Sequence, residues 1–178
     1  SRIMLLSELE KNEAKTTKTG KGAEKIAAIS SELATNMDEI VWALNSDNDY
    51  VENLVAYIRR FAVEYFENSP VRLTINTPGK MDHIPISGER RRNIFYTVKE
   101  ALNNILKHAE ATEAELKFVV INDKLDVIIS DNGKGIPEEK LNRFGNGINN
   151  MRARMKSISG DFKIESHHGT RIFLKLAI

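Results

Sequence analysis

Hydrophobic residues recur at helical spacing through the first quarter of the chain. The longest series, with steps of three and four residues, is Ile26, Ile29, Leu33, Met37, Ile40 and Leu44. A seam of this kind packs against another helix more readily than against a sheet. Residues 1–10 show similar spacing, and residues 11–22 are polar and end in glycine. We therefore expect residues 1–46 to hold the end of one helix, a turn and a second helix.

This helical hairpin has two interpretations. A stripe of this length with no third helix favours a homodimer in which two hairpins form a four-helix bundle. Alternatively, the hairpin packs on its own domain. Because helical spacing begins at Ser1, which is not an initiator methionine and has no capping signal before it, we expect the chain to be a fragment that starts inside the first helix. The polar residues 45–49 predict a domain boundary, with a second domain over 47–178.

Helical and strand patterns alternate after that boundary. Helices are expected from Val51 to about Tyr65, from a cap at Ser87 to beyond position 100, and over 148–158. Alternating apolar residues predict strands over 71–76, 116–120, 125–129, 162–166 and 171–178. Asn122-Asp123 predicts a hairpin turn between two of them. Helices grouped with a mixed, mostly antiparallel sheet give an α+β fold of two layers.

The helix after Ser87 has a distinctive polar face. Its apolar arc holds Ile94, Val98, Leu102, Ile105 and Ala109. A second arc, well rotated from the first, holds Glu100, Asn104, Lys107 and His108. An amide oxygen beside a carboxylate suits a hard cation such as Mg²⁺, and a neighbouring lysine suits the phosphates that accompany it. An ordinary solvated face is the alternative interpretation.

Three glycine motifs follow this helix. A strand leads into Asp131-Asn132-Gly133-Lys134-Gly135, where the acid can accept from an exocyclic amine while the glycines admit a flat ring. Gly145-Asn146-Gly147 precedes a helix, which favours phosphate binding. Gly169-Thr170 lies between the last two strands. Each motif alone is explained by a turn, but their order after the Glu–Asn–Lys helix is not.

Composition narrows the class of protein. The 178 residues are 41% hydrophobic and 29% charged, which describes a soluble globular chain. A net charge of +1 gives no argument for nucleic acid or an anionic membrane. No apolar run approaches the roughly 20 residues that span a bilayer. The absence of cysteine excludes disulfides and Cys-based zinc sites, and it is compatible with a cytoplasmic setting.

The order of these motifs resembles the ATP-binding module of sensor histidine kinases, DNA gyrase, Hsp90-type chaperones and MutL proteins. Residues 100–109, 131–135 and 145–147 resemble the N, G1 and G2 boxes, and 169–171 the terminal glycine–threonine motif. The short lid and the lysine–histidine ending of the N box are most similar to the histidine kinases that pair with NarL-type response regulators. The resemblance implies a Bergerat-type sandwich, with ATP and Mg²⁺ as cofactors.

The resemblance also implies roles for single residues. Asn104 would bind Mg²⁺, with Glu100 near the γ-phosphate or its metal as a base. Asp131 would accept from the adenine amine. The other implied contacts are Lys107 and His108 to phosphates or ribose, Gly133 and Gly135 at the adenine, Gly145 and Gly147 bordering the phosphates, and Thr170 on the adenine side through its hydroxyl or a water.

The implied function is Mg-ATP-dependent phosphoryl transfer to a histidine and then to a response-regulator aspartate. The family's acceptor histidine is followed by an acid, which is true of none of His83, His108, His167 and His168. The acceptor is therefore expected outside this chain, which should not phosphorylate itself. Expected partners are a second copy, through the N-terminal helices, and a receiver domain.

We expect a cytoplasmic location and no membrane contact by this chain; a membrane anchor in the full-length protein stays open. Two other functions stay open as well. The first is an ATP-driven conformational clamp, as in gyrase or the chaperones, although those proteins have longer lids and a transducer domain. The second is an interaction module without nucleotide binding, against which the glycines and Asn104 argue.

Overall fold

A computed structural model describes residues 22, 25–30, 33–34, 37, 41–42, 45, 49–79, 81, 83–137 and 146–178. The chain divides into two compact units, Ser1–Asn45 and Ser46–Ile178. Most of the predicted hairpin lies outside the described residues. The described members of its seam are helical and expose large fractions of their surface: 59% for Ile26, 47% for Ile29, 58% for Leu33 and 65% for Met37.

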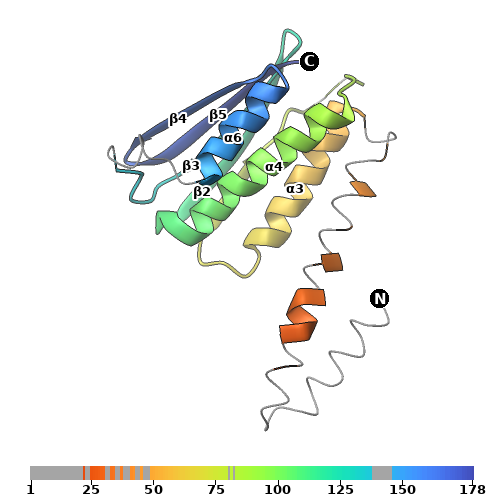
Figure 1. The fold of residues 1–178 in the computed structure, drawn as a ribbon. Helices are drawn as coiled ribbons and strands as arrows, with labels where there is room; N and C mark the ends of the chain where they lie inside the picture. The colour runs from red at the N-terminus through yellow and green to blue at the C-terminus, as the bar shows by residue number, and fades with distance from the viewer. Residues whose placement is uncertain are drawn as a thin grey trace. The chain divides into compact units, whose positions relative to one another are not determined.

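The second unit is a five-stranded sheet with helices on one face (Figure 1). Its helical segments are α3 (Val51–Phe66), α4 (Gly88–Asn104), η2 (Ile105–Ala109) and α6 (Asn146–Ser157). Its strands are β1 (Arg72–Asn76), β2 (Glu113–Ile121), β3 (Lys124–Asp131), β4 (Asp161–His167) and β5 (Gly169–Ala177). The spatial order is β1-β2-β3-β5-β4, with β1 parallel to β2 and the other pairs antiparallel. The predicted α+β fold with a mixed sheet is confirmed.

The β2–β3 hairpin has the predicted turn. Asn122 and Asp123 both have positive φ, 51° and 56°, as a two-residue type I′ turn requires. The turn sets the register, which pairs Leu116 with Ile129 and Phe118 with Val127. These apolar side chains all point to the helical layer, because alternate residues of a strand face the same way. The core of the unit lies between that sheet face and the helices.

Helix α4 is the centre of the helical layer. Figure 1 shows it between α3 and α6. Its predicted cap is present, since Ser87 Oγ accepts from the Arg90 N–H at 3.3 Å. The predicted apolar arc is buried along its whole length, from Ile94 through Leu102 to Ala109. Helix α4 thus packs on the sheet through its apolar arc, and its polar arc remains available for other contacts.

The end of this helix differs from the prediction. Regular α-helix ends at Asn104, and a π-helical segment, Ile105–Ala109, follows it. Glu110, in the left-handed region at φ 54°, ends the segment. A π turn closes its hydrogen bonds over five residues instead of four. The spacing of 100° per residue, from which we placed Lys107 and His108 beside Glu100, therefore does not hold after Asn104.

Among the residues that the structure describes, no helix combines the length and apolar character needed to cross a membrane.

Candidate functional site

A cavity of about 470 Å³ opens between the end of α4, the first turns of α6 and strands β3 to β5. Most of the residues predicted for the site line it. The predicted residues in its wall are Glu100, Asn104, His108, Asp131, Gly135, Gly147 and Thr170. Gly145 lies outside the described residues. The fold therefore brings the helix, strand and glycine motifs to one place, as their order in the sequence suggested.

The polar part of the wall comes from α4. Glu100 and Asn104 stand one turn apart on the same face, and both line the cavity. Gly147, the second residue of α6, approaches Glu100 so closely that a methyl group there would overlap the Glu100 carboxylate. The first turn of α6 and the acid of α4 therefore meet directly at the cavity.

The side-chain oxygens of Glu100 and Asn104 are suitable ligands for Mg²⁺. The described residues contain no group of three or more histidines and acids that could hold a metal by themselves. Mg²⁺ does not need one, because it is usually held by one or two protein oxygens together with substrate phosphates and water. The Asn104 amide oxygen and the Glu100 carboxylate, both in the wall, supply hard ligands of that kind.

Asp131 is fixed at the end of β3. Its Oδ1 accepts a hydrogen bond from the Gly133 N–H at 2.8 Å, which sets the orientation of the carboxylate and leaves Oδ2 for a ligand. Gly169 crosses behind it with φ 90°, and a methyl group there would overlap the Asp131 carbonyl. Only glycine combines that φ with so close an approach. Glycine is therefore required at position 169 by the backbone conformation and by the close packing on Asp131.

Two predicted residues lie beside the cavity and not in its wall. Lys107 is exposed and does not line it, whereas its neighbour His108, also exposed, does. Gly133 packs on the end of η2, where a methyl group would overlap the Ala109 carbonyl. The Lys134 N–H donates to that same carbonyl at 2.9 Å. The lack of a side chain at Gly133 therefore allows the loop to pack closely on η2.

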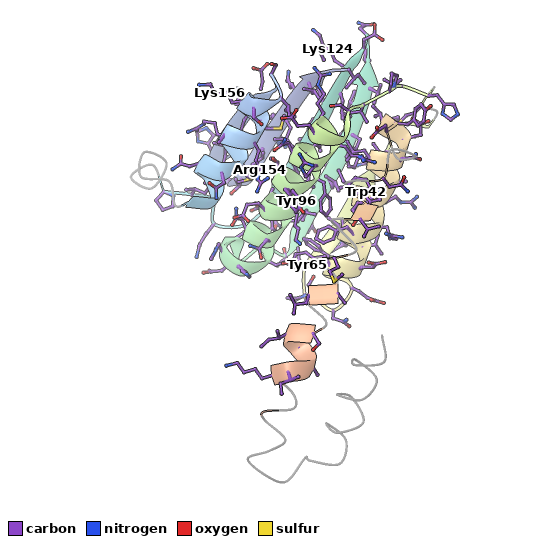
Figure 2. The ribbon with its side chains drawn as sticks, turned by 45° about the vertical axis from the view of Figure 1, so that its right-hand side comes forward. Trp42, Tyr65, Tyr96, Lys124, Arg154 and Lys156 are labelled. Atoms are coloured by element: carbon purple, nitrogen blue, oxygen red, sulfur yellow. The ribbon has the colours of Figure 1, made fainter. Side chains whose placement is uncertain are left out.

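Helix α6 is held on α4 by contacts outside the cavity. The Arg154 guanidinium lies over the Tyr96 ring, 5.0 Å from the ring centroid, and Figure 2 shows the two side chains together on the helical layer. A cation over an aromatic face is attracted by the ring's quadrupole. Met155 of α6 is buried in the core. These contacts keep the first turn of α6 at the cavity.

A hydrogen bond from α3 reaches the same stretch of α4. Tyr65 Oη donates to Asn103 Oδ1 at 3.0 Å, one residue before Asn104. Burial raises the pKa of the Tyr65 hydroxyl, and the negative charge of Glu100 raises it further. Tyr65 therefore stays a neutral donor over the physiological pH range and supports the polar face of α4 from outside the cavity.

Comparison with known proteins identifies the fold and the family. Residues 89–178, half of the chain, match the family described as histidine kinase-, DNA gyrase B- and HSP90-like ATPase. The chain belongs to this ATPase family. The histidine kinase domain from the blue-light activated kinase of Erythrobacter litoralis EL346 aligns with a TM-score of 0.64 at 19% identity, over 99% of this chain and 94% of that one.

Curated relatives of this ATPase domain are sensor histidine kinases, which confirms the resemblance. Sensor histidine kinase YvfT of Bacillus subtilis is 34% identical over 106 residues, which are 60% of this chain and 28% of that protein. UhpB of Salmonella typhimurium, a histidine-protein kinase/phosphatase, is 33% identical over 97 residues, 54% of this chain and 19% of the relative. The chain thus spans less than a third of either relative.

The sequence did not reveal the apolar part of the cavity. Much of the wall consists of aliphatic side chains, namely Ile105, Ile129, Ile136, Ile148, Met151, Ile164 and Ile172. Apolar walls with a few polar groups are typical of sites for flat organic ligands. Apart from Ile136, these residues look like core in the sequence. Their one available signal is that they flank the polar and glycine motifs.

The sequence also gave no role to Asn132. Its Oδ1 accepts from the backbone N–H groups of Thr112 and Glu113, both at 2.9 Å, and its Nδ2 donates to Thr112 Oγ1 at 2.9 Å. The residue between the aspartate and the first glycine of the motif thus ties the loop to the start of β2. Its side chain acts on the loop and does not line the cavity.

Proposed function

We propose that this chain is the catalytic, ATP-binding part of a sensor histidine kinase. It would transfer the γ-phosphoryl group of Mg-ATP to a histidine, from which the group passes to an aspartate of a response regulator. The observation that carries the proposal is that Glu100, Asn104, Asp131 and Thr170 line one cavity with an apolar wall. Such a set can hold a metal-bound polyphosphate and a flat amine-bearing ring together.

The geometry of the cavity supports a role for each residue at the base. Asp131 Oδ2 would accept from the adenine amine while Oδ1 stays bonded to the Gly133 N–H, and the Thr170 hydroxyl would contact the same ring directly or through water. Gly135 and the aliphatic side chains of the wall would pack on the faces of the ring. One charged acceptor and the shape of the wall would together fix the position of the base.

The phosphate end is formed by α4 and the start of α6. Asn104 would coordinate Mg²⁺, which neutralises phosphate charge when bound. Glu100, beside Gly147, would orient or deprotonate the attacking group. His108, in the wall, would contact ribose or phosphates, and Lys107, which does not line the cavity, would contact the phosphates from its rim. The proposal extends to Gly145, outside the described residues, as a phosphate neighbour.

Two partners complete the proposal. The exposed apolar seam of the first unit would pair with that of a second copy. A receiver domain, of the NarL type by the form of the N box, would take the phosphoryl group.

None of the chain's histidines is followed by an acid, so we propose that the acceptor is supplied by a separate segment and that this chain does not phosphorylate itself.

Phosphoryl transfer in trans tests this function. The chain would be mixed with γ-³²P-labelled ATP, Mg²⁺ and a separate helix that bears a histidine followed by an acid. We expect label on the helix with wild type and none with Asn104→Ala. Bound nucleotide without transfer would contradict the kinase proposal. If such nucleotide also closed a dimer, the conformational clamp would be favoured instead.

A further inference from the structure

The hydroxyl of Ser166 joins two backbone segments that border the cavity. Ser166 lies in β4, where its Oγ accepts from the Ile136 N–H at 2.5 Å and faces the Gly169 carbonyl, to which it donates, at 3.3 Å. Ile136 lines the cavity, and Gly169 directly precedes Thr170, which also lines it. Ser166 itself is half-buried and is not part of the wall.

The loop after β3 is shaped to reach this hydroxyl. Gly135 has φ 70°, and a methyl group at that position would stand 2.7 Å from Ser166 Oγ. A side chain there would push the hydroxyl away or displace the loop. The absence of a Cβ at Gly135 is therefore what permits the bond between Ser166 and the next residue.

Ser166 provides the last of a series of anchors along the described part of this loop. Asn132 ties its start to β2, and the Lys134 N–H bonds to the Ala109 carbonyl at the end of η2. The Ile136 N–H bonds to Ser166, and the residue after it, Pro137, has no N–H to offer. Without Ser166, the loop would keep its first two anchors and lose the one nearest Thr170.

We infer that Ser166 is a positioning residue for the nucleotide. It fixes the Gly135–Ile136 backbone against the Gly169–Thr170 backbone, and so sets the width of the cavity at the adenine. The nucleotide part of this inference rests on the proposed function, whereas the anchoring of Ile136 is independent of it. The loss of a positioned wall weakens binding although no contact to the ligand is removed.

Three variants test the role. Ser166→Ala removes the hydroxyl, and Ser166→Thr keeps it at a strand position that tolerates branching. Ser69→Ala is the matched control, because Ser69 Oγ also accepts from one N–H and donates to one carbonyl, both of Val71, and lies outside the cavity wall. Stability in urea is measured for all three, so that a general loss of stability is distinguished from a local one.

Two measurements distinguish the anchoring of the loop from its effect on nucleotide binding. In Ser166→Ala without ligand, we expect hydrogen exchange at the Ile136 amide to rise about fivefold or more relative to wild type, and Mg-ADP binding to weaken by about five- to tenfold, the usual effect of one hydrogen bond. Ser166→Thr and Ser69→Ala should match wild type in both.

The inference would be overturned if Ser166→Ala left the exchange at the Ile136 amide unchanged. It would also be overturned if the wild type bound Mg-ADP and Ser166→Ala bound it equally tightly, or if Ser69→Ala lost as much affinity as Ser166→Ala. A wild type that binds no adenine nucleotide would instead refute the proposed function. In that case the exchange rate at Ile136 would still decide whether Ser166 anchors the loop.

Discussion

Gly147 and the carboxylate of Glu100 are in such close contact that a methyl group on the glycine would overlap the carboxylate. The two residues come from different helices and lie far apart in the sequence. Their contact places the acid of α4 at the first turn of α6, where unsatisfied N–H groups favour negative charge. The lack of a side chain at position 147 is therefore a requirement of the proposed catalytic residue.

Gly147→Ala should displace the Glu100 carboxylate, because its flexible end can yield while the helix backbone cannot. We expect phosphoryl turnover to fall by about tenfold to a hundredfold, which is at most the lower limit of what a general base contributes, because Glu100 is displaced and not removed. Mg-ADP affinity should change much less. Turnover and affinity are measured on the same preparation. Gly79→Ala is the control, since nothing lies within 4 Å of a methyl group there. Equal turnover in the two variants would exclude the proposed role of Glu100.

Asn104→Ala should remove the dependence of nucleotide affinity on Mg²⁺ and leave the fold intact, because the side chain is only half-buried. Titrations with ADP in Mg²⁺ and in EDTA check this. The neighbouring Asn103→Ala is the matched control: it loses the hydrogen bond from Tyr65 and should keep the Mg²⁺ effect. If the Asn104→Ala protein still binds ADP more tightly with Mg²⁺ than in EDTA, the assignment of Asn104 as a Mg²⁺ ligand is refuted.

Asp131→Ala should weaken ATP binding by about 1.5–3 kcal/mol, the usual contribution of a hydrogen bond to a charged group. It should also abolish preference for ATP over GTP. Asp126→Ala, on the same strand but the opposite face, is the control; its carboxylate lies 3.9 Å from Lys175 and not in the cavity. Competition between ATP and GTP measures the preference. Undiminished preference in Asp131→Ala would refute the adenine contact.

The Arg91–Asp49 pair should matter for stability and not for ligand binding. The Arg91 side chain is 1% exposed, and its Nη2 lies 3.2 Å from Asp49 Oδ1. Burial lowers the pKa of Arg91, and the charge of Asp49 opposes that effect. Asp49→Ala should lower the free energy of unfolding by about 1–3 kcal/mol, because a buried guanidinium loses its counter-ion.

The exposed pair of Arg72 and Glu113 provides the comparison. Its side chains are 75% and 54% exposed, so Glu113→Ala should cost less than about 1 kcal/mol. Urea unfolding of both variants checks the difference. Equal losses would mean that burial of Arg91 does not make its partner important.

The sheet was predictable because its signals are local. Asn122-Asp123 requires a tight turn, the turn fixes the register, and alternation then assigns the buried face through Leu116 and Val127. The apolar arc of α4 was predictable for the same reason. The family motifs added the ligand site, since four short stretches occur in a fixed order.

The other features depend on contacts between distant segments. The π-helical turn is not visible in the sequence, because Ile105 and Ala109 are buried equally well at α-helical spacing. Its effect is that His108 lines the cavity and Lys107 does not. Ser166 looks like an ordinary hairpin serine until the fold brings Ile136, thirty positions earlier, to its hydroxyl.

Calorimetric titration of the wild-type chain with Mg-ADP tests the central claim most directly. We predict one site per chain and a clearly weaker affinity when EDTA removes the metal, since the phosphates then lose the ion that links them to Asn104. Absence of binding, or an affinity that is the same with and without Mg²⁺, would contradict this account of the cavity.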